Sequence, residues 1–197
     1  MNLVAAATFA TVFAALSAAH AVGDHWSQEH EDAQRKGLPG WEGRWACLRH
    51  VLSYLATAAA ALVLTGLYIG LELELVAAAA GLAVSGVSHY VADRREPLRR
   101  IADALGKREF YQVNSNGICG SYLLDQSWHL GFTLWAALIA ASGNDGLGVT
   151  VVLAAAVTIA LAVKVRRFER RGRLAKQVAP VSPAVEIRQP ASSRVEA

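Results

Sequence analysis

The chain has 197 residues, of which 54% are hydrophobic and 18% are charged, and its mean hydropathy is positive, at +0.30. Long apolar stretches of this kind exclude an ordinary soluble domain and indicate a membrane protein. The net charge of +3 is small, and because no Lys or Arg precedes Arg35 we expect no nucleic-acid partner. The two cysteines do not form the disulfide framework of a small secreted protein.

The first apolar segment covers residues 3–23, which at about 1.5 Å per residue is long enough to cross a bilayer core of about 30 Å. A cleaved signal peptide is the alternative, because Ala19-His20-Ala21 resembles a small-x-small cleavage site. Against this alternative, no positive charge precedes the apolar run, and the run is longer than the apolar part of a typical signal peptide. We therefore interpret the segment as a retained membrane span.

Four more apolar segments follow, separated by polar ones. Residues 24–45 contain Gly and Pro and are predicted to form an interfacial loop, and residues 93–122 form a longer loop with a short amphipathic helix around residues 97–105. Residues 164–197 are predicted to be a basic, disordered tail. The sequence thus predicts an all-α, polytopic membrane helical bundle in residues 1–163. It has about five transmembrane helices, at residues 3–23, 46–71, 75–92, 123–142 and 147–163.

The basic residues indicate the orientation of the bundle. Ten Lys and Arg lie in the two long loops or next to them, nine lie in the tail, and none lies in the short turns near residues 72–74 and 143–146. Basic residues accumulate on the cytoplasmic side of membrane proteins. We therefore expect an inner-membrane protein with its N-terminus outside and its C-terminus in the cytoplasm. Besides the lipid bilayer itself, we expect anionic lipids to contact the basic loops and tail.

Three His–Asp pairs, each with a spacing of four residues, are the main candidates for a functional site. They are His20/Asp24, His89/Asp93 and, in reverse order, Asp125/His129. A spacing of four places both side chains on one helix face. The reversed pair lies on the span that runs in the opposite direction, so in every pair the histidine lies deeper by about 6 Å. His50, near the start of the second span, is expected at the same depth.

Imidazoles and carboxylates are ligands for zinc, manganese and iron, and ionisable groups within membrane spans usually face the bundle interior. We therefore expect a divalent-metal site, with Asp24 as general base or as a further ligand. Hydrogen-bonded His–Asp pairs that only join helices, or a pathway for protons or cations, are the alternatives. The expected metal ligands are His20, His50, His89, Asp93, Asp125 and His129.

Three motifs resemble those of a family of small bacterial polytopic membrane proteins known as a domain of unknown function. They are His20-x3-Asp24-His25, His89-Tyr90-x2-Asp93, and Leu124-Asp-Gln-Ser-Trp-His129. The resemblance covers roughly residues 8–140. It implies the membrane fold and the importance of these positions, but it implies no reaction.

The site chemistry favours a metal-dependent hydrolase that acts on a lipid-linked or other amphipathic substrate. A divalent-cation carrier is the first alternative, because His–Asp pairs on several helices also suit ion transport. A structural or regulatory membrane protein, whose polar cluster only locks the bundle, is the second.

Overall fold

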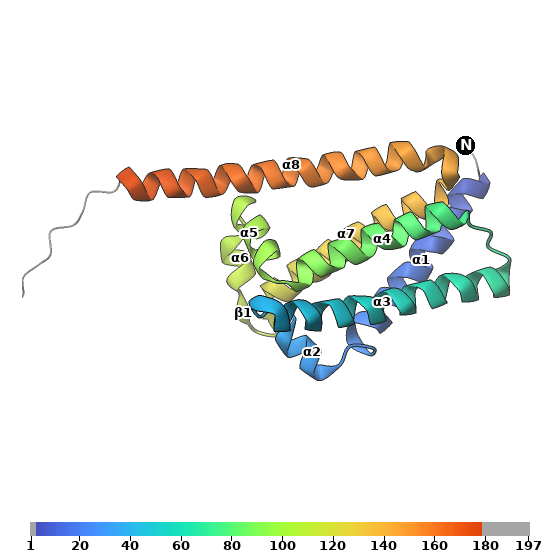
Figure 1. The fold of residues 1–197 in the computed structure, drawn as a ribbon, viewed down its shortest axis with the longest axis horizontal. Helices are drawn as coiled ribbons and strands as arrows, with labels where there is room; N and C mark the ends of the chain where they lie inside the picture. Colours follow the sequence, from blue (N-terminus) through green and yellow to red (C-terminus); the bar gives the residue numbers. More distant parts are fainter. Residues whose placement is uncertain (1–2, 179–197) are drawn as a thin grey trace, which may run out of the picture.

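The computed structural model describes residues 3–178, which form helices and one short hairpin (Figure 1). The strands β1 (Asn114–Ser115) and β2 (Ile118–Cys119) pair antiparallel. The helices are α1 (Leu3–His25), α2 (His30–Arg35), α3 (Gly40–Ile69), α4 (Leu75–Asp93), α5 (Glu96–Ala104), α6 (Arg108–Gln112), α7 (Gly120–Ala141) and α8 (Gly143–Val178). The predicted all-α membrane bundle is confirmed.

Four helices, α1, α3, α4 and α8, are long and apolar enough to cross a membrane. The predicted fourth span forms α7, which is 22 residues long. It is less apolar than the other four because Asp125, Gln126 and His129 lie in its first half. Helix α7 packs against α1 and α4, and His129 is buried between helices rather than facing outward.

The structure differs most from the sequence prediction at the start of α3 and the end of α8, and the short helix α2 lies within the predicted interfacial loop. Helix α3 begins at Gly40, so residues 40–45 are helical rather than part of a loop. Helix α8 continues to Val178, so residues 164–178 are helical rather than disordered. The Arg, Lys, Leu and Ala of this segment are good helix formers, and the preceding span supplies the helix that they extend. The rest of the predicted tail, residues 179–197, lies outside the described residues.

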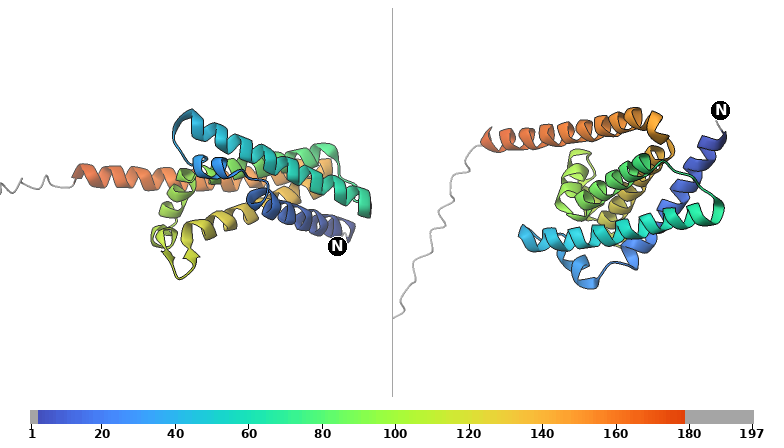
Figure 2. Two further views of the ribbon diagram at one scale, coloured as in Figure 1. Left: turned by 90° about the horizontal axis from the view of Figure 1, so that it is seen from below. Right: turned by 45° about the vertical axis from the view of Figure 1, so that its right-hand side comes forward.

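The five long helices run between two ends of the molecule (Figures 1 and 2). The turn end carries the short connections from α3 to α4 and from α7 to α8, and the polar end carries α2, α5, α6 and the hairpin. Gly70, with φ of +67°, ends α3 in the left-handed conformation that favours glycine. Helices α1, α3, α4 and α7 form the bundle, while α8 runs along one side and contacts α4, α5 and α7.

An apolar core fills the bundle between the middle of the spans and the turn end. Its buried residues come from α1, α3 and α7 and are mainly Ala, Val and Leu. Small residues also bring α4 and α7 close together, because a Cβ atom on Gly81 would lie 2.5 Å from the carbonyl oxygen of Ala136. This close antiparallel contact sets the distance between the polar side chains that α4 and α7 carry nearer the polar end.

Candidate metal centre

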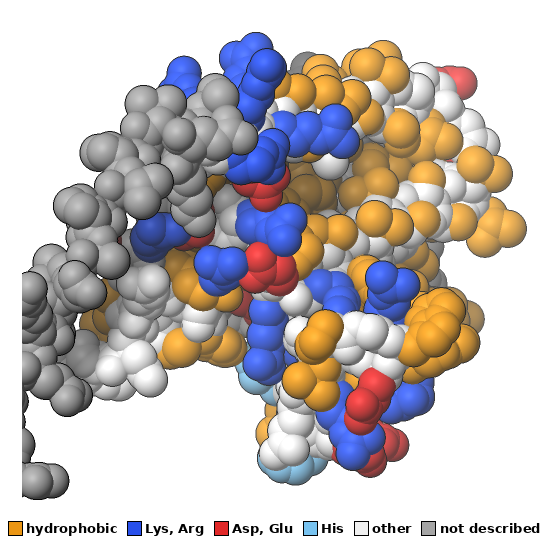
Figure 3. Space-filling view, turned by 60° about the vertical axis from the view of Figure 1, so that its left-hand side comes forward, with side chains coloured by type: hydrophobic (Ala, Val, Ile, Leu, Met, Phe, Trp, Pro, Cys, Tyr) orange, Lys and Arg blue, Asp and Glu red, His pale blue; other side chains and the backbone are white. Residues whose placement is uncertain are grey.

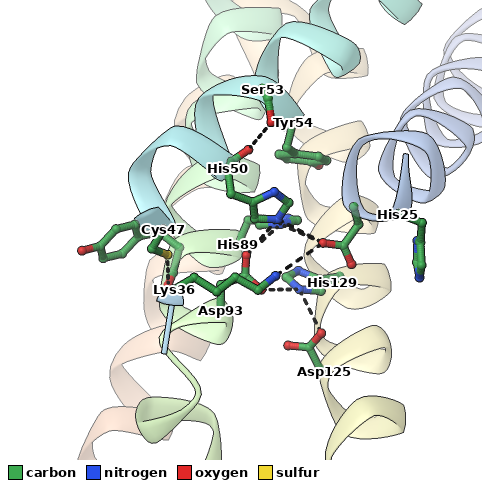
Figure 4. A network of polar contacts seen from close by, with 12 residues as sticks. His25, Lys36, Cys47, His50, Ser53, Tyr54, His89, Asp93, Asp125 and His129 are labelled. Atoms are coloured by element: carbon green, nitrogen blue, oxygen red, sulfur yellow. Dashed lines mark hydrogen bonds and ion pairs between the residues drawn. The ribbon is translucent and has the colours of Figure 1, made fainter. Parts of the chain in front are cut away.

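Four histidine rings from four helices, those of His20, His50, His89 and His129, meet inside the bundle, and Figure 4 shows the last three. The His89 ring lies at the centre, with ring centroids 4.1 Å from His129, 5.0 Å from His50 and 5.5 Å from His20. All four side chains are buried. The common depth predicted from the His–Asp spacing therefore corresponds to direct contact between the rings.

Four donor atoms form a compact set at the polar side of these rings. The Nε2 atoms of His50 and His89 are 2.9 Å apart. His50 Nε2 lies 3.1 Å from Asp24 Oδ1 and 3.0 Å from Asp93 Oδ2, and His89 Nε2 lies 3.5 Å and 3.2 Å from the same two oxygens. Helices α1, α3 and α4 thus place two imidazole nitrogens and two carboxylate oxygens around one point.

The spacing of this set is close to what one small cation needs. Neighbouring corners of a tetrahedron lie about 1.6 bond lengths apart, so zinc with ligand bonds of about 2.0–2.2 Å needs donor atoms about 3.3–3.6 Å apart. The five distances run from 2.9 to 3.5 Å, so one lies within this range and the others are slightly shorter. The four residues of this set are one of three groups of His and Asp in the described part of the chain whose donor atoms lie close enough to share an ion.

Hydrogen bonds alone do not account for these contacts. Each Nε2 atom carries at most one proton, and ionised carboxylates only accept hydrogen bonds. At most two of the five short contacts can therefore be hydrogen bonds at the same time. Among residues 3–173, His89 Nδ1 and Asp93 Oδ2 are also buried without a hydrogen-bond partner. Buried polar groups without partners are rare, and an ion is one of their explanations.

The three other predicted site residues, His20, Asp125 and His129, lie directly beside these four donor atoms. His129 Nε2 is 3.4 Å from Asp125 Oδ2 and 3.9 Å from Asp93 Oδ1. The His20 ring centroid lies 4.8 Å from that of His129. The Nε2 atoms of His20 and His129 have no hydrogen-bond partner in the described part of the chain. All seven predicted residues therefore converge, but in two layers rather than as one equivalent set.

Lys36 is a member of the site that the sequence did not indicate. Its Nζ lies 2.9 Å from Asp93 Oδ1 and 3.9 Å from Asp24 Oδ1. The formal charges of Asp24, Asp93, Asp125 and Lys36 sum to −2 when the histidines are neutral. One divalent cation balances this charge, and buried charges require such compensation.

Two arginines hold the segment that carries Lys36. Arg94 donates through Nη1 to the carbonyl oxygen of Lys36 and through Nη2 to that of Leu38, both at 2.6 Å. Arg95 donates to the carbonyl oxygen of Ala33 at 3.1 Å. These arginines directly follow Asp93 in the chain, so the same turn that ends α4 also fixes the position of the lysine. Their role here is to bind backbone, in addition to any contact with lipid.

Gln126 is the second member that sequence reasoning missed. Its Nε2 donates to Asp24 Oδ2 at 3.0 Å and so orients the carboxylate whose other oxygen faces the histidines. The feature of the sequence that could have indicated this role is the place of Gln126 inside the Leu124–His129 motif, directly after Asp125. For Lys36 no comparable signal exists, because it lies in a segment without periodicity or motif.

A cavity of about 610 Å³ at the polar end leads to the site. Its wall includes Asp24, Lys36, Asp93 and Asp125, together with residues of α6 and α7. Tyr111 of α6 also lines it, and burial raises the pKa of the Tyr111 hydroxyl, which therefore stays neutral. Substrate or ions can thus approach the carboxylates from the polar end.

The opposite side of the histidine layer is closed. The Tyr54 ring stacks on His89 with centroids 4.2 Å apart, and its hydroxyl hydrogen-bonds the Ser85 hydroxyl. Beyond these residues lies the apolar core described above. The arrangement is a polar site with one opening, not a channel through the described part of the bundle.

His25, His30 and Cys47, which could also bind a metal, belong to none of the groups of donor atoms found among the described residues. His25 points away from the cluster and shares a hydrogen bond with the Tyr122 hydroxyl at 3.0 Å (Figure 4). His30 pairs with Gln34 on α2 at 2.8 Å. Cys47 is buried and its thiol donates to the carbonyl oxygen of Tyr90 at 3.7 Å.

The fold and the site together define an all-α membrane bundle with buried His and Asp groups that can hold a metal ion. Comparison with models of protein families, with curated proteins and with solved structures finds no match to this chain. The family suggested by the motifs therefore stays a prediction.

Proposed function

We propose that the protein is a divalent-metal-dependent membrane hydrolase whose ion is held by Asp24, His50, His89 and Asp93. The observation that carries this proposal is the close approach of their four donor atoms, with five contacts of 2.9 to 3.5 Å. Two imidazoles and two carboxylates make up the number and kind of ligands that zinc commonly takes, so we propose zinc, with manganese and iron as the alternatives. When bound, the ion would supply Lewis-acid chemistry and lower the pKa of water.

The remaining residues of the site support hydrolysis rather than simple metal storage. A structural zinc needs only four ligands, yet His20, Asp125 and His129 lie beside the set. Asp125 lines the cavity, and its side chain is 23% exposed. With Asp24 among the ligands, we assign the general-base role to Asp125, which can accept a proton from water in the cavity. The imidazole of His129 lies 3.4 Å from the Asp125 carboxylate.

The position of the opening supports a lipid-linked or amphipathic substrate. The cavity lies at the polar end of the bundle, and the proposed ligands Asp24 and Asp93 line it. A substrate with an apolar anchor can remain in the bilayer while its polar group enters the cavity. We place this end in the cytoplasm of a bacterial cell, on the inner membrane, because the basic residues gather there.

The two alternatives are less well supported. A carrier needs a polar path to the other side, whereas the core between the histidines and the turn end is mainly Ala, Val and Leu, with Thr133 and the Ser17 hydroxyl as buried polar groups. A polar cluster that only locks the bundle should satisfy its own hydrogen bonds. Here four buried atoms of the cluster have no such partner among the described residues.

Hydrolysis can be tested without knowing the substrate. The purified protein is loaded with zinc and incubated, in water enriched in oxygen-18, with vesicles made from a total lipid extract of bacterial inner membrane. We expect labelled products from the wild type and at least about a hundredfold less from Asp125→Asn. Asp145→Asn, at the turn end, is the matched control and should retain activity.

The same protein in sealed vesicles separates the alternatives. Zinc uptake that depends on His89, measured with an enclosed zinc-sensitive dye, would establish a carrier and contradict the hydrolase. Bound zinc with neither labelled product nor uptake would favour the structural role.

A further inference from the structure

A second and larger opening lies between α4 and α8, on the opposite side of α4 from the metal centre. This α4–α8 groove has a volume of about 1210 Å³. Pockets for drug-sized molecules usually measure about 300–1,000 Å³, so the groove suits a larger ligand. Its floor is formed by Trp128 and Phe132 of α7, whose rings are 4.7 Å apart.

One face of α8 is directed into the groove along most of its membrane-spanning length. The groove residues on this helix recur every three or four positions, which is the period of one helix face. They include Val151, Ala155, Thr158, Ala162 and Val165. Facing them on α4 are Val84, Val87 and Val91. In a bilayer, a gap between such apolar walls is filled by an apolar chain rather than by water.

The groove becomes basic at the polar end, where Arg44, Arg94, Arg100 and Arg166 line it. Figure 3 shows Lys and Arg side chains gathered at this end of the molecule, beside a hollow lined with hydrophobic side chains. Two glutamates, Glu96 and Glu169, also line this end. Four positive charges against two negative ones leave the rim basic.

Several of these positive charges are not neutralised by protein. Arg100 pairs with Glu96 at 2.9 Å and with Glu169 at 3.4 Å. Arg94 donates only to uncharged backbone carbonyls, and the guanidinium carbon of Arg44 lies 5.5 Å from the Trp41 ring centroid. Within residues 3–173, Arg166 makes no ion pair. The rim therefore offers at least three cations for a bound anion.

The groove is long enough to hold one acyl chain of a lipid. From Arg166 back to Val151 the helix rises by about 22 Å, at about 1.5 Å per residue. One leaflet of a bilayer core is about 15 Å thick, half of the total of about 30 Å. A phosphate held at the arginines would thus leave room for a full acyl chain between α4 and α8.

We propose that the α4–α8 groove is a binding site for one anionic phospholipid, with its phosphate at the arginine rim and an acyl chain between the two helices. The lipid would fill the space that separates α8 from the bundle and join α8 to α4. This inference does not depend on the metal centre. The Trp128 Nε1 atom donates to the carbonyl oxygen of Ser88 at 3.2 Å and separates the groove from the neighbouring histidines.

Native mass spectrometry of the full-length, delipidated protein tests the proposal. The protein is mixed with equal amounts of phosphatidylglycerol and phosphatidylcholine that have identical acyl chains. We expect one phosphatidylglycerol to be retained in preference to phosphatidylcholine. Arg166→Gln should weaken retention about fivefold. Arg167→Gln, the adjacent arginine outside the groove, is the matched control and should have no effect.

A second matched pair tests the apolar part of the groove. Ala162→Trp places an indole between the helices and should abolish retention, whereas Ala160→Trp, on the opposite face of α8, should not. Equal loss in Arg166→Gln and Arg167→Gln would overturn the proposal, because it would indicate nonspecific contact. A protein dimer with no retained lipid would overturn it as well, since a second copy would then occupy the groove.

Discussion

His50 Nε2 lies 2.9 Å from His89 Nε2, and both nitrogens lie within 3.5 Å of the same oxygens of Asp24 and Asp93. The two histidines come from helices α3 and α4, so nothing local in the chain forces this approach. Two nitrogens and two carboxylate oxygens that share so small a space can be satisfied together by one cation. Metal binding is therefore the central property that we expect of this site.

Replacing a central ligand should remove the metal. His89→Ala takes away one of the two imidazoles that each contact the three other members of the proposed ligand set. We expect about one equivalent of zinc in the wild type and no stoichiometric zinc in His89→Ala, measured by plasma mass spectrometry of purified protein. His30→Ala, which removes a histidine outside the cluster, should bind as the wild type does. Equal zinc in all three proteins would contradict the assignment.

Removing the metal should lower stability. A ligand that binds only the folded state stabilises it by about 2.7 kcal/mol at a free concentration one hundred times its dissociation constant. We expect a chelator to lower the midpoint of thermal unfolding of the wild type in detergent. The same chelator should leave the midpoint of His89→Ala unchanged. A midpoint that is insensitive to the chelator in the wild type would argue against a bound ion.

Lys36→Met should affect the metal-free protein more than the loaded one. Without the lysine, Asp93 loses its ion pair at 2.9 Å and becomes a buried carboxylate without compensation, at a cost of about 3–5 kcal/mol. A bound divalent cation supplies the missing charge, so zinc should reduce the loss. The measurement is the unfolding midpoint with and without chelator. Lys107→Met, at an exposed position, should change neither value, and a loss of equal size in both states would contradict the charge argument.

Gly81→Ala should loosen the contact between α4 and α7. The added Cβ would lie 2.5 Å from the Ala136 carbonyl oxygen, so the helices must separate, at a cost of about 1–3 kcal/mol. Gly131→Ala is the matched control, because a Cβ there meets no atom within 4 Å. It should be neutral or stabilising, since alanine is the better helix former. Because Gly81 lies eight residues from His89 on α4, we also expect weaker zinc retention in Gly81→Ala only.

Much of the site could be predicted from sequence because helices in membranes have a regular geometry. The spacing of His20/Asp24 and His89/Asp93, and the reversed order at Asp125/His129, fix depth along each helix. Depth and burial together bring such residues into one layer. The sequence does not specify rotation about each helix axis, so it could not separate the four proposed ligands from the residues beside them. It therefore left Asp24 as general base or further ligand, and we propose the ligand role because Asp24 Oδ1 lies 3.1 Å from His50 Nε2.

The parts that sequence reasoning missed depend on contacts between distant segments. Lys36 reaches Asp93 only because Arg94 binds the backbone of the α2–α3 connection. The α4–α8 groove depends on how far α8 stands from the bundle, which its apolar composition does not determine. The helical extension to Val178 was also missed. The basic composition of residues 164–178 suggested disorder, although most of these residues are good helix formers.

X-ray absorption spectroscopy at the zinc edge tests the metal centre most directly. For the wild type, we expect a first shell of four nitrogen and oxygen atoms at about 2.0–2.2 Å, with imidazole scattering beyond it and no sulfur at about 2.3 Å. A shell of six oxygens, or one that contains the sulfur of a cysteine, would contradict the assignment of Asp24, His50, His89 and Asp93 as the four ligands.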